Sequence, residues 1–198
     1  MSKHTLIVGL GNPGREYRNN RHNVGFQVLD HLAERHGLAF TRQQADALIA
    51  TGQIAGRAVI LAKPQTFMNN SGGPVASLQR FYKIDLPQLL VVFDDLDLPP
   101  GTIRMRPSGG SSGQKGMKSI IERLGSEGFP RLRIGIGRPP GRMDPAAYVL
   151  QDFSEEERAI MQEVYERAAD AIETWLTDGI ELAMSRYNGP LDRPQGSA

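Results

Sequence analysis

A polar loop that follows an apolar run near the amino terminus carries the side chains best suited to chemistry. The run Leu6–Leu10 is rich in branched residues and predicts a buried strand, and Asn12-Pro13-Gly14 ends it with a sharp turn. His22 follows in the same polar loop. Open α/β sheets bind their ligands beyond the carboxyl ends of their strands. We therefore expect an amide, from Asn12, and an imidazole, from His22, at such an edge.

Two later apolar runs also end in polar side chains that suit the same chemistry. Asn69 and Asn70 follow the run at 58–62, and Asp94, Asp95 and Asp97 follow the run at 89–93. If these strands are parallel to the first, all these polar groups meet at one edge of the sheet. An imidazole with a carboxylate partner and nearby amides can activate water as a general base. Each residue alone could instead form a turn or cap a helix, so the prediction rests on their joint placement.

Strands and helices alternate along the chain, which predicts an α/β fold. The pattern predicts strands at Thr5–Leu10, Ala58–Ala62, Leu89–Phe93, Thr102–Arg106 and Leu132–Gly137. It predicts helices from Asn23 to before Gly37, at Ser71–Tyr82, at Lys115–Leu124, after Ser154 and after Gly179. Loops near 40–57 and 95–101 indicate some antiparallel pairing. We expect a single domain at residues 1–188, with a twisted, mixed and mostly parallel sheet surrounded by helices, and a flexible tail at 189–198.

Two of these helices carry apolar faces that predict how they pack. In the helix at 71–82, the residues expected to point inward are Val75, Leu78, Phe81 and Tyr82. In the helix that Ser154 begins, Glu157 completes a capping box. The apolar face of that helix consists of Met161, Val164, Ala168, Ile172 and Trp175. Both helices are therefore expected to cover the sheet.

The composition excludes several kinds of site. The 198 residues include no cysteine, which excludes disulfides, a thiolate nucleophile and cysteine-ligated zinc. His31 and His36 are five residues apart and do not share a helix face, so no metal site is predicted. No run is long and apolar enough to span a membrane, and the short apolar start matches a first strand better than a secretory signal. We expect a cytoplasmic protein without membrane contact.

The net charge of +1 hides two oppositely charged segments. Residues 101–142 contain nine lysines and arginines against two acids, and residues 144–181 contain eleven acids against two arginines. A basic stretch taken at random is usually only a solvated face. Here the basic residues are interleaved with glycines and short strand patterns, which favours an anion-binding surface.

Two familiar motifs are only partly matched. Glycines at 9, 11 and 14, with Asp30 further on, resemble a dinucleotide fingerprint, but the next residues lack the apolar stripe of the helix that it needs. We interpret them as a turn and a loop. The run Gly109–Gly113 matches G-x-S-x-G, yet all four histidines precede Ser111, which is the wrong order for that triad. This loop is better interpreted as a nest of backbone amides for an anion or an ester carbonyl.

Several runs between Leu6 and Tyr187 are distinctive when taken together. They are LIVGLGNPGREY, RHNVGF, KPQTFMNNSG, FDDLDLPPG and RLRIGIGRP, in that order. In these runs the chain resembles the bacterial-type peptidyl-tRNA hydrolase family. The resemblance implies one α/β domain with a mixed sheet, and an enzyme that hydrolyses the ester between a peptide and the 3′ ribose of tRNA. The implied partner is peptidyl-tRNA, the implied state is a monomer, and no metal or cofactor is implied.

The resemblance also implies roles for individual residues. His22 resembles the catalytic base, and Asp94 resembles the carboxylate that orients it. Asn12 and Asn69 resemble amides that hold the peptide and the water near the scissile ester. The walls of the implied substrate cleft are Tyr17 and Met68.

The basic segment contains further implied binding residues. Arg106 and Arg133 resemble the pair that grips the 5′ phosphate of tRNA, with Arg104 assisting. Where many members of the family read Gly-Gly-His-Asn-Gly, this chain reads Ser112-Gly113-Gln114-Lys115-Gly116. Lys115 therefore stands where the family has an asparagine that contacts the 3′ end of the substrate. A lysine there can donate hydrogen bonds but cannot accept one.

Two other functions stay open at this point. A non-catalytic RNA-binding relative would keep the basic surface without turnover, whereas the joint presence of His22, Asp94, Asn12 and Asn69 favours the enzyme. A nucleotide-dependent α/β enzyme is supported only by the glycine pattern. A cleavage assay on peptidyl-tRNA without added metal distinguishes all three.

Overall fold

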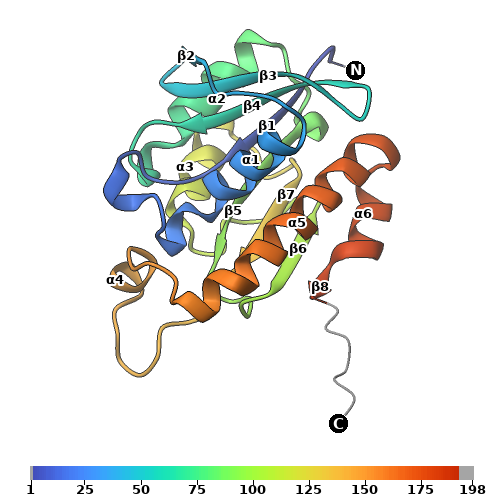
Figure 1. Ribbon diagram of the computed structural model, residues 1–198. Helices are drawn as coiled ribbons and strands as arrows, with labels where there is room; N and C mark the ends of the chain where they lie inside the picture. The colour runs from blue at the N-terminus through green and yellow to red at the C-terminus, as the bar shows by residue number, and fades with distance from the viewer. Residues whose placement is uncertain (1, 192–198) are drawn as a thin grey trace.

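A single mixed sheet lies between two layers of helices in the computed structural model, which describes residues 2–191 (Figure 1). The strands within this range are β1 (Thr5–Gly9), β2 (Arg42–Gln44), β3 (Ala47–Ile54), β4 (Arg57–Pro64), β5 (Leu89–Asp95), β6 (Thr102–Arg106), β7 (Arg131–Gly135) and β8 (Gly189–Pro190). Their order across the sheet is β2-β3-β4-β1-β5-β7-β6-β8. Strands β4, β1, β5 and β7 are parallel to one another, and the outer strands are antiparallel to their neighbours. The predicted mixed sheet with a parallel core is confirmed.

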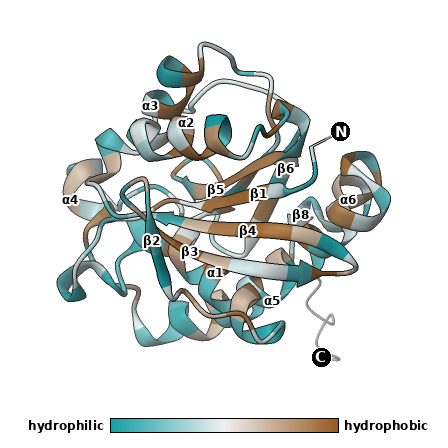
Figure 2. Ribbon diagram, turned by 90° about the horizontal axis from the view of Figure 1, so that it is seen from above, coloured by the Kyte–Doolittle hydropathy of each residue, from teal (hydrophilic) through white to brown (hydrophobic). Residues whose placement is uncertain are grey.

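Helices cover both faces of this sheet, as the view from above shows (Figure 2). They are α1 (Val24–Arg35), α2 (Gly72–Phe81), α3 (Lys115–Leu124), α4 (Pro145–Val149), α5 (Glu155–Asp178) and α6 (Ile180–Tyr187). Side chains of α1, α4, α5 and α6 form one apolar core against the sheet. Side chains of α2 and α3 form the other core against the opposite face. The sheet is therefore buried on both sides, which explains why its central strands are almost continuously apolar.

Most of the predicted elements are present. The capping box of Ser154 and Glu157 forms at the start of α5, and the predicted apolar face of that helix is buried. The sequence patterns predicted no strand at β2 or β3, only antiparallel pairing near them, and they missed the five-residue α4.

One prediction about packing is wrong. Phe81 was expected to point inward from α2, but its side chain is 68% exposed, whereas Val75 and Leu78 are fully buried. Residues three apart on a helix differ by about 300° in direction, so a second step of three turns Phe81 well away from Val75. Tyr82, seven residues after Val75, returns close to the buried direction and is half-buried.

Helix α1 and β1 touch through their backbones at one point, beside the side chains that pack between them. A Cβ atom added to Gly9 would lie 2.2 Å from the carbonyl oxygen of Gly25, and one added to Gly25 would lie 2.4 Å from the backbone nitrogen of Leu10. Gly9 therefore serves helix packing. After Gly14 the chain forms the short 3₁₀ turn Arg15–Tyr17, which agrees with a turn and loop rather than a dinucleotide-binding helix.

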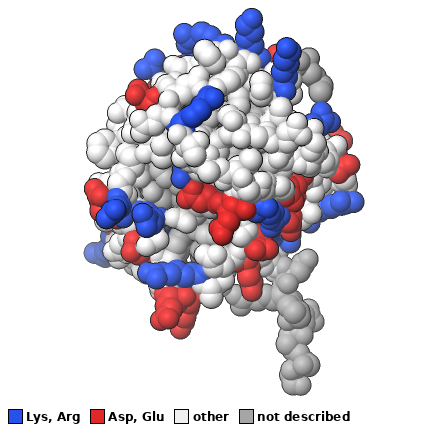
Figure 3. All heavy atoms as spheres, turned by 45° about the horizontal axis from the view of Figure 1, so that its top comes forward, with Lys and Arg blue, Asp and Glu red and all other residues white. Residues whose placement is uncertain are grey.

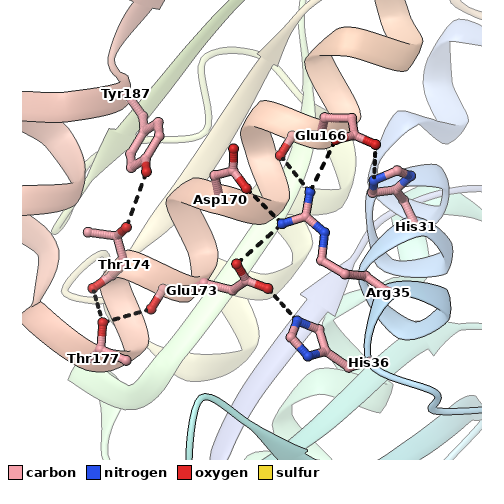
Figure 4. A network of polar contacts seen from close by, with 9 residues as sticks. All are labelled: His31, Arg35, His36, Glu166, Asp170, Glu173, Thr174, Thr177 and Tyr187. Atoms are coloured by element: carbon pink, nitrogen blue, oxygen red, sulfur yellow. Dashed lines mark hydrogen bonds and ion pairs between the residues drawn. The ribbon is translucent and has the colours of Figure 1, made fainter.

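The acidic segment of the sequence pairs with basic groups of α1 (Figure 4). The guanidinium of Arg35 contacts three carboxylates of α5, those of Glu166, Asp170 and Glu173. His31 also contacts Glu166, and His36 contacts Glu173. Three of the eleven acidic side chains at 144–181 therefore pair with basic groups of α1 or the residue after it, and they join α5 to α1.

The carboxyl-terminal residues extend the sheet. Gly189 and Pro190 form β8 beside Thr102 and Ile103 of β6, within the range assigned to the flexible tail. Residues 192–198 of that predicted tail lie outside the described residues. Among the described residues, no helix has the length and apolar character needed to cross a membrane.

Candidate active site

The carboxyl ends of the parallel strands bring together the polar groups that the sequence singled out. A cleft of about 430 Å³ opens at this edge. Its walls include Asn12 from the loop after β1, His22 from the 3₁₀ turn Arg21–Asn23, and Asp94 near the end of β5. The remaining lining comes from Leu96, from the loop residues Ser112, Gly113, Gln114 and Lys115, and from Asp144, Pro145, Ala146, Val149 and Leu150 at α4. One side of the cleft is thus polar, and the side formed by α4 is mainly apolar.

His22 and Asp94 form the closest polar pair in the cleft. The Nδ1 atom of His22 lies 2.7 Å from Oδ2 of Asp94, whose side chain is only 3% exposed. A carboxylate can only accept a hydrogen bond, so Nδ1 carries the proton and donates it. This arrangement leaves the Nε2 atom of neutral His22 with a free lone pair, as a general base requires.

The surroundings of His22 raise its pKa above the ordinary value of 6.5. Burial opposes the charged imidazolium and lowers the pKa, but the charge of Asp94 and the hydrogen bond to it outweigh that effect. The ammonium group of Lys115 acts in the opposite direction and lowers it. Asp94 therefore both orients the imidazole and stabilises its protonated form.

Asn12 links the turn that carries His22 to the turn that follows β4. Its Oδ1 atom accepts a hydrogen bond from the backbone nitrogen of Met68 at 2.8 Å. Its own backbone nitrogen donates to Oδ1 of Asn23, and its carbonyl oxygen accepts from Nδ2 of Asn23, both at 2.9 Å. The side-chain oxygen of Asn12 is thus occupied, which leaves the amide nitrogen as its group able to meet a ligand.

The other predicted substrate residues lie outside the cleft walls. Within the described part of the chain, Tyr17, Met68 and Asn69 are not among the residues that line the cleft. Met68 is buried beneath it, and its sulfur lies 3.2 Å from the amide nitrogen of Gln114. Tyr17 is half-buried and Asn69 is exposed. Lys115, by contrast, is exposed and stands at the cleft.

Four arginines share one face of the β6–β7 pair. Arg104 stands opposite Arg133, and Arg106 stands opposite Arg131. Arg133 donates to Oδ2 of Asp95 at 2.5 Å and to Oγ of Ser112 at 2.9 Å. Arg104 and Arg106 are half-buried and have no hydrogen bond or ion pair with any described residue. Two of the three predicted phosphate ligands are therefore unpaired, whereas Arg133 already has two partners.

Arg131, at the start of β7, holds the glycine- and serine-rich loop at 109–113 through the carbonyl oxygen of Gly110. Its guanidinium donates to the carbonyl oxygens of Gly110, Glu127 and Phe129. Burial lowers the pKa of Arg131 to about 10, against the attraction of Glu127, and the group stays charged at neutral pH. This arginine is part of the framework of the loop.

Ion pairs with nearby carboxylates neutralise part of the positive charge that the sequence concentrates at 101–142. Asp95 and Asp97, which precede this segment, pair with Arg133 and Arg138. On the face drawn in Figure 3, lysines and arginines are scattered over a largely uncharged upper half, and acidic side chains lie beside basic ones below. Fewer cationic side chains are therefore free to bind an anion than the charge count predicts, and Arg104 and Arg106 are among the unpaired ones.

Three side chains that shape the site carry no role in the sequence-based prediction. Gln114 hydrogen-bonds to Asp94, and Asn23 hydrogen-bonds to Asn12. Arg21 is buried, stacks 4.1 Å from the ring centre of Tyr148 in α4, and pairs with Glu157 at 3.0 Å. Arg21 and Asn23 flank His22 in the run RHNVGF, and that adjacency was the available signal.

The fold and the site together define a class, a single-domain α/β enzyme with a histidine–carboxylate pair arranged for general-base chemistry. The family model for peptidyl-tRNA hydrolase matches residues 6–195. The chain is 54% identical over 184 residues to the peptidyl-tRNA hydrolase of Chloroflexus aggregans, covering 92% of this chain and 98% of that protein. It is 51% identical over 183 residues to that of Syntrophomonas wolfei, with 92% and 99% covered.

Solved structures agree with this result. A crystal structure of peptidyl-tRNA hydrolase from Acinetobacter baumannii superposes with a TM-score of 0.89 at 34% identity, covering 95% of this chain and 97% of that one. The chain belongs to the peptidyl-tRNA hydrolase family.

Proposed function

We propose that this chain hydrolyses the ester that joins a peptide to the 3′ ribose of tRNA, and so recycles tRNA released prematurely from ribosomes. The observation that carries the proposal is the pair formed by His22 and Asp94 in a cleft of about 430 Å³. Membership of the family supports the substrate, because the matched relatives bear its name.

The reaction follows from the free Nε2 atom of His22. Nε2 takes a proton from water while the water oxygen attacks the ester carbonyl carbon, which gives a tetrahedral intermediate. The protonated imidazole then returns that proton to the ribose 3′ oxygen as the ester bond breaks. The products are a tRNA 3′ hydroxyl and a peptide carboxylic acid, which releases its remaining proton to solvent, with no covalent enzyme intermediate. Proton transfer of this kind contributes ~10²–10⁴-fold, so positioning and stabilisation of the oxyanion provide the rest.

Groups around the cleft supply that positioning in this proposal. The amide nitrogen of Asn12 donates to the peptide or to the developing oxyanion. Lys115 stands beside the cleft and offers a positive charge to the substrate's 3′ end. Asn69, Tyr17 and Met68 contact the peptide where it leaves the cleft. None of these roles needs a group from outside the chain.

The arginines bind the tRNA body in this proposal. Arg104 and Arg106 offer unpaired guanidinium groups to the 5′ phosphate, and Arg133 adds the part of its guanidinium that Asp95 and Ser112 leave free. Phosphate contacts give affinity without reading sequence, which suits an enzyme that acts on many tRNAs. We further propose that the protein works as a monomer in the cytoplasm, where its substrate arises.

A non-catalytic RNA-binding relative is the weaker candidate. Such a protein needs the basic surface, but it has no need of a buried carboxylate that holds an imidazole in one tautomer within a cleft. The geometry of His22 and Asp94 therefore favours turnover.

The test is cleavage of purified peptidyl-tRNA in a buffer that contains a metal chelator. The wild type should release peptide, and His22→Ala should lose about 10²–10⁴-fold in turnover while binding tRNA as before. Binding by the wild type without cleavage would favour the RNA-binding candidate, and full turnover by His22→Ala would remove His22 from the mechanism.

A further inference from the structure

We propose that Gln114 is a positioning residue of this reaction, whose amide nitrogen holds Asp94 in the orientation that presents it to His22. The inference rests on the proposed function. It gives a role to Gln114, a residue for which the sequence predicted none. Gln114 precedes α3 and is 7% exposed.

The two oxygens of the Asp94 carboxylate have separate partners. Oδ2 accepts from Nδ1 of His22 at 2.7 Å, and Oδ1 accepts from Nε2 of Gln114 at 3.0 Å. Rotation of the carboxylate would break both hydrogen bonds in a buried place where no water replaces them at low cost. Gln114 therefore opposes any movement of Asp94 that would release His22.

The amide of Gln114 can present only its nitrogen to Asp94. Its Oε1 atom accepts a hydrogen bond from the backbone nitrogen of Met117 at 2.7 Å, which makes Gln114 the N-cap of α3. Nε2 also lies 3.2 Å from the sulfur of Met68. The start of the helix thus determines which end of the amide faces the carboxylate.

Capping alone does not account for glutamine at this position. Serine, threonine, aspartate and asparagine are the preferred N-cap residues because their short side chains reach the first turn well. A longer amide is needed to cap the helix and also reach across to β5. The side chain therefore connects α3 to the strand that carries Asp94.

The experiment separates positioning from capping by means of four variants. Gln114→Met keeps the size of the side chain but removes both hydrogen bonds. Gln114→Glu keeps an acceptor for Met117 and removes the donor to Asp94. Gln114→His restores a ring N–H as a donor. Ser154→Ala is the matched control. It removes the N-cap hydrogen bond of α5, which is 3.2 Å long, and Ser154 does not line the cleft.

Steady-state kinetics on peptidyl-tRNA and thermal unfolding are measured for each variant. We expect Gln114→Met and Gln114→Glu to lower kcat by ~10- to 100-fold, as a small misplacement does, with little change in KM. Gln114→His should recover part of this loss. Ser154→Ala should lower the melting temperature but keep kcat. Wild-type kcat in both Gln114→Met and Gln114→Glu would overturn the proposal.

A double-mutant cycle tests whether Gln114 acts through Asp94. In an Asp94→Asn background, Gln114→Met should cost little further activity. An equal loss in both backgrounds would show that Gln114 acts on something else and would overturn the inference.

A readout without turnover keeps the inference separate from the proposed function. The NMR signal of the Nδ1 proton of His22 reports its hydrogen bond to Asp94, and Gln114→Met should shift or broaden it while Ser154→Ala should not. An inactive wild type would overturn the proposed function, whereas an unchanged Nδ1 signal in Gln114→Met would overturn the inference.

Discussion

Asn23 satisfies both backbone polar groups of Asn12. Its Oδ1 atom accepts from the Asn12 backbone nitrogen, and its Nδ2 atom donates to the Asn12 carbonyl oxygen, each at 2.9 Å. Because His22 precedes Asn23 directly, this pair of bonds determines where the imidazole stands relative to the loop after β1. The site is therefore built on a contact between the side chain of Asn23 and the backbone of Asn12, which need not touch the substrate.

Replacement of Asn23 by aspartate should disturb catalysis more than binding. Asn23→Asp keeps the acceptor for the Asn12 nitrogen but leaves the Asn12 carbonyl facing a carboxylate oxygen. We expect kcat to fall by ~10²-fold, the cost of a displacement near 1 Å, with a smaller effect on KM. The control is Asn70→Asp on an exposed residue, and wild-type kcat in Asn23→Asp would show that the contact has no role in positioning.

The decline of kcat/KM on the acid side of the pH profile should report the protonation of His22. Neutral imidazole is the active base, so kcat/KM should decline as pH falls through the pKa of His22, with a midpoint above 6.5. Asp94→Asn removes the charge that raises this pKa, so the midpoint should move to lower pH and the plateau should fall. A plateau at the wild-type level, with only thermal stability reduced, would mean that Asp94 is a structural turn residue.

Removal of the Lys115 charge should shift the acid side of the pH profile of kcat/KM in the direction opposite to Asp94→Asn. Its ammonium lowers the pKa of His22, so Lys115→Met should move the midpoint of kcat/KM to higher pH. Lys115 is exposed, and salt screens such interactions, so the shift should be larger at low ionic strength. Lys118→Met, on the same helix but outside the cleft lining, is the control that should leave the midpoint unchanged.

The arginines of β6 and β7 should separate into two groups. Arg106→Ala should raise KM roughly tenfold or more, since hydrogen bonds to charged groups contribute ~1.5–3 kcal/mol, and should leave kcat unchanged. The slope of tRNA binding against salt should shrink by about one unit. Arg133→Ala should also lower kcat, because Arg133 contacts Asp95 and Ser112 beside the catalytic pair.

A substrate without the tRNA body tests this separation. The Arg106→Ala variant should cleave a minimal aminoacyl ester at the wild-type rate, and Arg133→Ala should not. Arg57→Ala, an exposed change at the start of β4 and so at the opposite end of the sheet, is the control for lost charge. Equal loss on both substrates by Arg106→Ala would place that side chain in the catalytic step.

Patterns close in sequence predicted the central fold and the meeting of His22 with a carboxylate at the end of β5. The apolar runs of β1, β4 and β5 are buried on both faces, so their composition alone identifies them as core strands. Parallel pairing of these strands then brings Asp94 to the edge that carries His22. The rule that such edges bind ligands placed Asp94 and Asp95 there alike, and only the resemblance to the family singled out Asp94.

Contacts that depend on exact register could not be predicted in this way. Gln114 meets Asp94 across twenty residues because β6 and the loop after it return the chain to the end of β5. Strand β3 escaped prediction because its residues from Thr51 to Gln53 are polar or lack a side chain. Helix α4 has only five residues, too few for a helical period to show.

The backbone contact between Gly9 and Gly25 has a further consequence for how this protein can change. No side chain separates α1 from β1 at that point, so direct contact between the two backbones sets their spacing there. A side chain added at Gly9 or Gly25 would push the two elements apart. His22 lies three residues before Gly25, so a change at either glycine reaches the imidazole although neither glycine lines the cleft.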